Sequence, residues 1–194
     1  MKKREFLTTT AALAMFPAGA VRAANAADRG PVLLTVSGDV GRTNCGQFDA
    51  VLDQMMAKHG VTFDQAFTFS AASLHRLPSV TIKPTLEYDA KVHALTGPLI
   101  STVLDAAGVK TSQAVQLGLR AVDGYNVAIG LQDVRSYRMI IATHIDGQAL
   151  GLGGLGPQWA VYDADKLASF KDKPLKDRFG LCPWGLYLVD VKTG

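Results

Sequence analysis

The chain has 194 residues, of which 48% are hydrophobic, so it is long enough to bury a core of its own. Its 20 basic and 17 acidic side chains give a formal net charge of +3. Beyond the first few residues the basic side chains form no run. This excludes a nucleic-acid partner, because binding phosphate requires clustered positive charge.

Residues 1–26 predict an export signal, with basic, apolar and cleavage-site segments in the usual order. These segments are Lys2 to Arg4, Ala11 to Val21 and Ala24-Asn25-Ala26. The apolar run is too short to span a membrane, which takes about 20 residues. The alternative is an N-terminal helix that belongs to the fold. Because four basic residues and one acidic residue precede the cut, the mature chain carries 16 of each.

Residues 27–194 are expected to form one domain, periplasmic or secreted, since no linker or repeat marks a second one. The β-rich residues 32–36, closed by Ser37-Gly38, predict the first strand. Apolar residues at helical spacing then predict a helix over residues 48–59, with Gly60 as its stop.

The next stretch mixes two patterns. Residues 63–75 predict a short helix that Pro78 ends, and residues 80–82 predict the start of a strand. Pro84 excludes a central, fully paired position for that strand, because proline has no N–H to donate to a neighbour.

Residues 96–109 contain the start and stop signals of a helix. Thr96 or Gly97 can cap it, Pro98 suits its first turn, and Gly108 can take the left-handed conformation that ends it. Its apolar residues share one face, so the helix must pack on a sheet. They are Leu99, Ile100, Val103, Leu104 and Ala107.

Strands dominate the remainder of the chain. Apolar and polar residues alternate over residues 115–121 and 125–129, and Asp123-Gly124 between them predicts a tight hairpin turn. A second turn is predicted at Asp146-Gly147. Further strands are expected over residues 139–142 (covered on both faces), 159–162 and 184–191. The fold class is therefore α+β, weighted towards β, with helices concentrated in the N-terminal half.

Four short motifs follow one another in an order that resembles the molybdopterin-binding domain of the sulfite-oxidase type. They are the segment 96–109, Val122-Asp123-Gly124-Tyr125, Ala142 to Gly147, and Gly156-Pro157. The resemblance extends from about Val32 to Val191. It implies the sulfite-oxidase-type molybdopterin-binding fold in a single domain, an oxidoreductase and a molybdopterin cofactor.

The chain departs from this family at two places. Cofactor-loaded members bind molybdenum through a cysteine thiolate about a dozen residues before the Gly-x-Pro-Leu element, and that count reaches Thr85 here, with no cysteine nearby. A hydroxyl is a hard, barely acidic group that cannot replace a soft thiolate. In addition, Asp163 and Asp165 follow Gly156-Pro157, where active members carry a Gly- and Lys-bearing segment that holds the pterin and phosphate.

The resemblance places five residues at a cleft: Thr85, Tyr88, Arg120, Asp123 and Tyr125. Two hypotheses follow. In the first, the protein is an enzyme that holds a molybdenum cofactor without a protein thiolate. In the second, it is a cofactor-free binding module whose old cofactor cleft takes a small-molecule ligand or a periplasmic partner such as a redox protein.

Other chemistry is weakly indicated. Gly151, Gly153 and Gly156 match the dinucleotide fingerprint, but Pro157 and a strand pattern follow where that motif needs a helix. The four histidines show no pair at metal-ligand spacing along the chain, so no metal site is predicted. Cys45 and Cys182 are predicted to pair in an oxidising compartment; the alternative is two separate buried thiols.

Overall fold

The computed structural model describes residues 30–110 and 114–194. The predicted export signal therefore lies outside the described residues. Within those two ranges, no helix has the length and apolarity that crossing a membrane would require.

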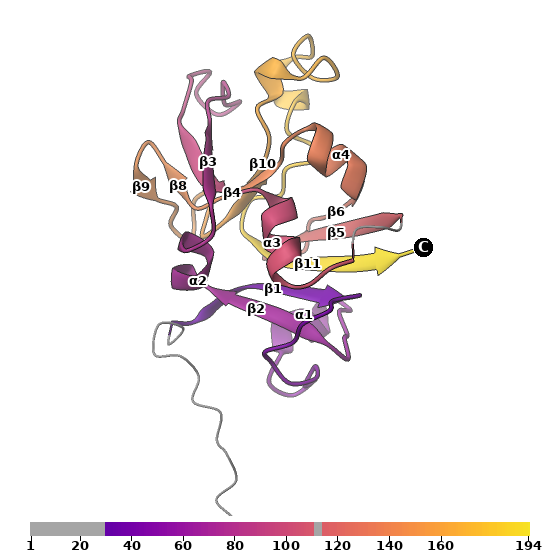
Figure 1. Ribbon diagram of the computed structural model, residues 1–194. Helices are drawn as coiled ribbons and strands as arrows, with labels where there is room; N and C mark the ends of the chain where they lie inside the picture. Colours follow the sequence, from indigo (N-terminus) through magenta and orange to yellow (C-terminus); the bar gives the residue numbers. More distant parts are fainter. Residues whose placement is uncertain (1–29, 111–113) are drawn as a thin grey trace, which may run out of the picture.

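A five-stranded sheet forms the larger layer of the molecule (Figure 1). Its strands, in spatial order, are β2 (Ala66–Ser70), β1 (Val32–Gly38), β11 (Leu186–Thr193), β5 (Val115–Ala121) and β6 (Asn126–Gly130). Strands β1 and β11 are parallel, and every other pair is antiparallel. The first and last strands of the described chain thus lie side by side at the centre of the sheet.

Two smaller sheets pack above it. One has the order β3 (Ser79–Ile82), β4 (Leu95–Pro98), β8 (His144–Ile145) and β9 (Gln148–Ala149), and the other pairs β7 (Ile140–Ala142) with β10 (Trp159–Val161). Strand β3 is an edge strand that ends just before Lys83-Pro84, as predicted. Both predicted hairpin turns are present, with positive φ at Gly124, Asp146 and Gly147.

The helices are short. They are α1 (Gln54–Lys58), α2 (Ala71–His75), α3 (Ile100–Ala106) and α4 (Leu131–Ser136), with 3-10 turns η2 (Ala164–Lys166) and η3 (Leu175–Asp177). The predicted β-weighted α+β class is confirmed. The helices are not concentrated in the N-terminal half, since among the described residues only α1 and α2 lie there and α3, α4 and both 3-10 turns lie in the C-terminal half. The helix predicted over residues 48–59 is present only as the shorter α1. The helix predicted over residues 63–75 is reduced to α2, because residues 66–70 pair with β1 and the Ser70 hydroxyl then caps α2.

The predicted helix over residues 96–109 begins later than its sequence signals indicate. Residues 95–98 form β4, and the helix starts at Ile100. A Cβ atom on Gly97 would collide with the carbonyl oxygen of Ile141 in β7. Gly97 therefore permits a close approach of two strands and caps no helix. The stop is confirmed, since Gly108 has a φ of +74°.

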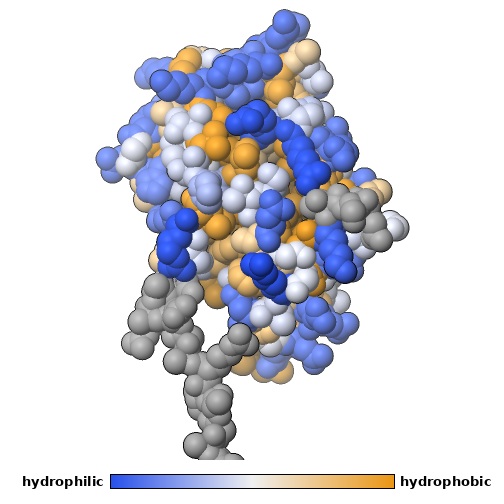
Figure 2. Space-filling model, in the orientation of Figure 1, coloured by the Kyte–Doolittle hydropathy of each residue, from blue (hydrophilic) through white to orange (hydrophobic). Residues whose placement is uncertain are grey.

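The two faces of the five-stranded sheet differ in how they are covered. Helix α3 buries its apolar side in one large cluster with the inner face of the sheet, β7, β10 and α4. The outer face has a separate small cluster of Val61, Tyr187 and Leu188, against which Met56 of α1 packs. Figure 2 shows one side of the molecule, where apolar residues gather near the middle among hydrophilic ones.

Candidate functional site

Two depressions receive four of the five predicted cleft residues. The first, called here the aromatic pocket, has a volume of about 280 Å³ and lies between residues 87–88, the β5–β6 turn and residues 176–184. It is lined by Tyr88, Asp123 and Tyr125, which were predicted, and by Glu87, Lys176 and Trp184 among those that were not. Segments far apart in the sequence thus meet at one opening.

Three aromatic side chains of this pocket remain accessible to solvent. Tyr88 is 56% exposed, Tyr125 50% and Trp184 39%. The Tyr125 hydroxyl donates to the Gly180 carbonyl oxygen at 2.7 Å, and its backbone N–H donates to Asp123 Oδ1 at 2.9 Å. Burial and the adjacent Glu87 carboxylate raise the pKa of Tyr88 to about 12. The pocket therefore presents neutral aromatic rings beside the side chains of Glu87 and Asp123.

Thr85 does not line this pocket. It is half-buried and forms an isolated bridge with Val92, and its backbone N–H donates to Asp165 Oδ2 at 2.7 Å. Arg178 Nη1 donates to the other oxygen of Asp165, also at 2.7 Å. Thr85, which the count along the sequence puts at the position of the family's thiolate, is thus hydrogen-bonded through its backbone to the Asp165–Arg178 ion pair.

The two acids that follow Gly156-Pro157, Asp163 and Asp165, are each paired with a cation. Lys166 Nζ donates to Asp163 Oδ2 at 2.7 Å, and Arg178 Nη1 donates to Asp165 Oδ1. Lys166 and Arg178 are therefore already engaged by internal carboxylates. A phosphate placed here would have to displace one of these pairs.

A sulfur does reach the aromatic pocket, which the sequence gave no reason to expect. Cys182 lines it, 4% exposed, and burial raises the pKa of its thiol to about 12. A thiol with so high a pKa is protonated at neutral pH, whereas metal ligation uses the thiolate.

The predicted disulfide is not formed, because both cysteines are free thiols. Cys45 Sγ donates to the Ala66 carbonyl oxygen at 3.4 Å, on the side of the sheet where α1 lies. Cys182 belongs instead to the large inner cluster. The five-stranded sheet separates the two thiols, so the alternative of two separate thiols describes the structure.

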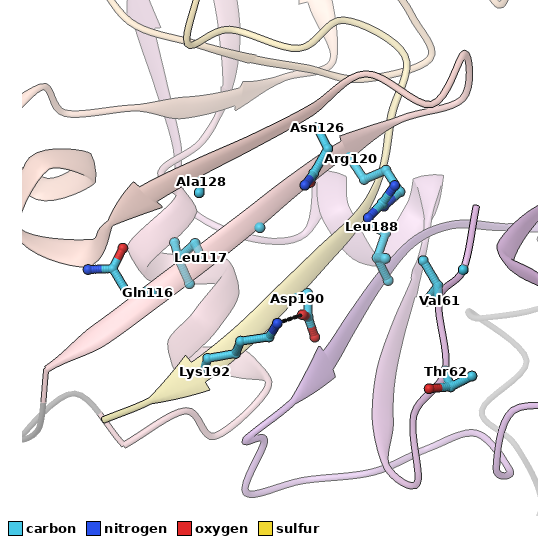
Figure 3. A pocket seen from close by; sticks show the side chains of 12 residues that line it. Val61, Thr62, Gln116, Leu117, Arg120, Asn126, Ala128, Leu188, Asp190 and Lys192 are labelled. Atoms are coloured by element: carbon cyan, nitrogen blue, oxygen red, sulfur yellow. Dashed lines mark ion pairs between the residues drawn. The ribbon is translucent and has the colours of Figure 1, made fainter.

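Arg120 lies in a second depression, called here the polar groove, with a volume of about 390 Å³ on the outer face of the sheet (Figure 3). Gln116, Asn126 and Lys192 also line it, and Lys192 Nζ pairs with Asp190 Oδ2 at 3.5 Å. Side chains alternate across a strand, so Arg120 points away from the inner face that Leu119 occupies. The structure thus separates Arg120 from the other predicted residues.

The described residues do not fit a molybdenum cofactor held in the family's manner. Thr85 offers a hydroxyl where the family has a thiolate, and Lys166 and Arg178 are already paired with Asp163 and Asp165. Among residues 30–110 and 114–194, no group of three or more His, Cys, Asp or Glu side chains could hold a metal ion.

Sequence reasoning missed Glu87, Lys176, Phe179, Cys182 and Trp184, which all line the aromatic pocket. Four of them come from one irregular segment between η2 and β11, where no periodic pattern marks which side chains face a site. Trp184 belonged to the strand expected over residues 184–191, but in the structure it precedes β11, which begins at Leu186, and it is 39% exposed.

No family model matches the sequence, and the search of curated proteins found no relative. Among solved structures, the fold is similar to the sulfane dehydrogenase SoxCD from Paracoccus pantotrophus, with a TM-score of 0.54 and 14% sequence identity. The match covers 81% of this chain and 37% of that chain. The chain thus spans little more than a third of the protein it matches, and at this identity the similarity concerns the fold alone.

Proposed function

We propose that this protein is an exported binding module on the sulfite-oxidase-type molybdopterin-binding fold, and that its aromatic pocket binds a small organic cation in place of a thiolate-ligated molybdenum centre. The sequence resemblance and the fold similarity to a sulfane dehydrogenase support the fold. The order of segments in residues 1–26 supports export.

One observation supports an organic cation as the ligand. Three exposed aromatic rings line a single depression together with the side chains of Glu87 and Asp123. Lys176 also lines it, so the lining holds two acidic side chains and one basic side chain. Aromatic faces attract cations by about 0.5 to 2 kcal/mol each, most strongly at tryptophan. Three such contacts sum to about 1.5 to 6 kcal/mol, a range that includes the roughly 4 kcal/mol of a dissociation constant of about 1 mM.

A titration with choline tests the ligand class, with isothermal titration calorimetry as the readout. Its uncharged analogue 3,3-dimethylbutan-1-ol has the same shape without the charge, so it should bind at least about tenfold more weakly. Trp184→Ala should abolish choline binding. Arg120→Ala, in the polar groove, is the matched control and should bind as the unchanged protein does. Equal binding of both probes would refute a cation site.

A second measurement separates this function from a molybdenum enzyme. Protein expressed in a host that makes the cofactor should contain far less than one molybdenum per chain. Thr85→Cys should raise the molybdenum content only slightly, because Lys166 and Arg178 remain paired with Asp163 and Asp165. Stoichiometric molybdenum in the unmodified protein would instead support the hypothesis that it is a molybdenum-dependent oxidoreductase. In that case Cys182→Ser would show whether the buried thiol acts as a ligand.

A further inference from the structure

Two histidines that are 69 positions apart in the sequence meet on the small four-stranded sheet. His75 is the last residue of α2, and His144 is the first residue of β8, which pairs with β4. Their ring centroids are 5.0 Å apart, and the rings are tilted by 49°. Neither histidine lines the aromatic pocket or the polar groove.

This separation suits a shared metal ion. Imidazole nitrogens bind Zn²⁺ at about 2.0–2.1 Å in tetrahedral geometry, which puts the centres of two such rings roughly 5 Å apart. The tilt keeps the two rings from stacking face to face. His75 is exposed and His144 is half-buried, so a metal ion and its water ligands can reach the pair from solvent.

A hydrogen bond holds the ring of His144. Thr143 Oγ1 lies 2.9 Å from His144 Nδ1, and the same hydroxyl lies 3.4 Å from the Thr96 carbonyl oxygen. Nδ1 of His144 is thus engaged within the protein, whereas no hydrogen bond from the described residues occupies Nε2. This arrangement, in which one ring nitrogen is anchored and the other is left open, is the usual support of a metal-bound histidine.

His75 ends the short helix α2, and its exposed imidazole can supply the second nitrogen ligand. From these observations we propose that His75 and His144 bind one Zn²⁺ ion, or a similar transition-metal cation that imidazole favours, with water completing its coordination.

Calorimetric titration of the metal-free protein with ZnCl₂ at pH 7.5 tests the proposal. We expect one equivalent of Zn²⁺ to bind saturably and Mg²⁺ to give no signal, because Mg²⁺ prefers oxygen ligands. His75→Ala and His144→Ala should each weaken Zn²⁺ binding by about tenfold or more. His93→Gln and Cys45→Ser are matched controls that leave the pair intact, and each should bind Zn²⁺ as the unchanged protein does.

A measurement without substitutions covers the case in which a variant fails to fold. In imidazole ¹H–¹⁵N spectra of the unmodified protein, Zn²⁺ should move the signals of His75 and His144 and leave those of His59 and His93 in place. Absence of saturable binding, movement of another pair, or loss of binding in Cys45→Ser would overturn the proposal. The result does not depend on the aromatic pocket, so it also stands apart from the proposed function.

Discussion

The inner and outer faces of the five-stranded sheet serve different purposes. On the inner face, Leu34, Val36, Leu117 and Leu119 are at most 1% exposed and belong to one cluster with α3. On the outer face, the corresponding positions of β1 and β5 carry Thr35, Ser37, Gln116 and Arg120, and apolar burial is confined to a few residues near α1. The same strands thus supply a core on one side and a polar groove on the other.

This difference indicates where the sequence is free to change. A side chain on the inner face is fixed by close packing, so replacing it leaves a cavity or causes a collision. Gln116 and Arg120 on the outer face, and Tyr125 and Trp184 in the aromatic pocket, remain in contact with solvent, so close packing constrains them less. The following predictions test this contrast, beginning with the largest expected effect.

Gly97→Ala should destabilise the protein by about 4 kcal/mol or more, because the new Cβ would collide with the Ile141 carbonyl oxygen between β4 and β7. Gly118→Ala, on the outer face, is the matched substitution. There the nearest atom to the new Cβ is Asp190 Cβ at 3.5 Å, an ordinary contact, so stability should change by less than about 1 kcal/mol. Urea denaturation measures both. Similar losses would contradict the contrast between the faces.

Leu119→Ala should cost roughly 3 to 4 kcal/mol of unfolding free energy, since Leu119 is 0% exposed within the large cluster. Leu188→Ala removes an equally buried leucine from the small outer cluster, and about 2 kcal/mol is expected because fewer neighbours surround the cavity. The comparison uses the same denaturation assay. A larger loss at Leu188 would show that the outer cluster also determines the fold.

The two thiols should differ in reactivity. Under non-reducing, denaturing conditions both cysteines should react with a thiol reagent, since neither is paired. In the folded protein Cys45 should react first, because it is only partly buried and lies on the outer side. Cys182 should require unfolding, since burial raises its pKa to about 12. A count of zero reactive thiols after denaturation would instead demonstrate a disulfide.

The smallest effect is expected at His93, whose Nδ1 lies 2.6 Å from Asp146 Oδ2 and whose Nε2 lies 3.0 Å from Asp89 Oδ2. These hydrogen bonds, the one to Asp146 first, raise the pKa of His93. The stabilisation is therefore fully present below the unfolded pKa of about 6.5 and is lost as the pH rises through the folded value.

Thermal unfolding of His93→Gln and the unchanged protein at pH 5.5 and pH 8.5 measures this effect. The difference in Tm should be larger at pH 5.5, where the histidine is charged and the pKa values of Asp89 and Asp146 are held low by His93. A difference that does not vary with pH would mean that the charge of His93 contributes nothing.

The sequence by itself determined strands such as β1, β5 and β6, the two hairpins and the helix stop at Gly108. These features depend on local rules: the alternation over residues 115–121, and the positive φ that Gly124 and Gly108 can adopt. The predicted start of this helix was wrong because Gly97 and Pro98 have the pattern of a helix cap and a first turn. Their actual role in β4 depends on the approach of β7, which lies some 40 residues further along the chain.

For the candidate site, sequence reasoning placed Tyr88, Asp123 and Tyr125 in one pocket but could not find Trp184 or Cys182. It also grouped Arg120 with these residues, whereas the structure places Arg120 in the polar groove, because its side chain lies on the outer face of β5. Only the tertiary structure brought His75 to His144 and kept Cys45 from Cys182. Contacts between distant segments depend on strand order and packing, which local residue patterns do not encode.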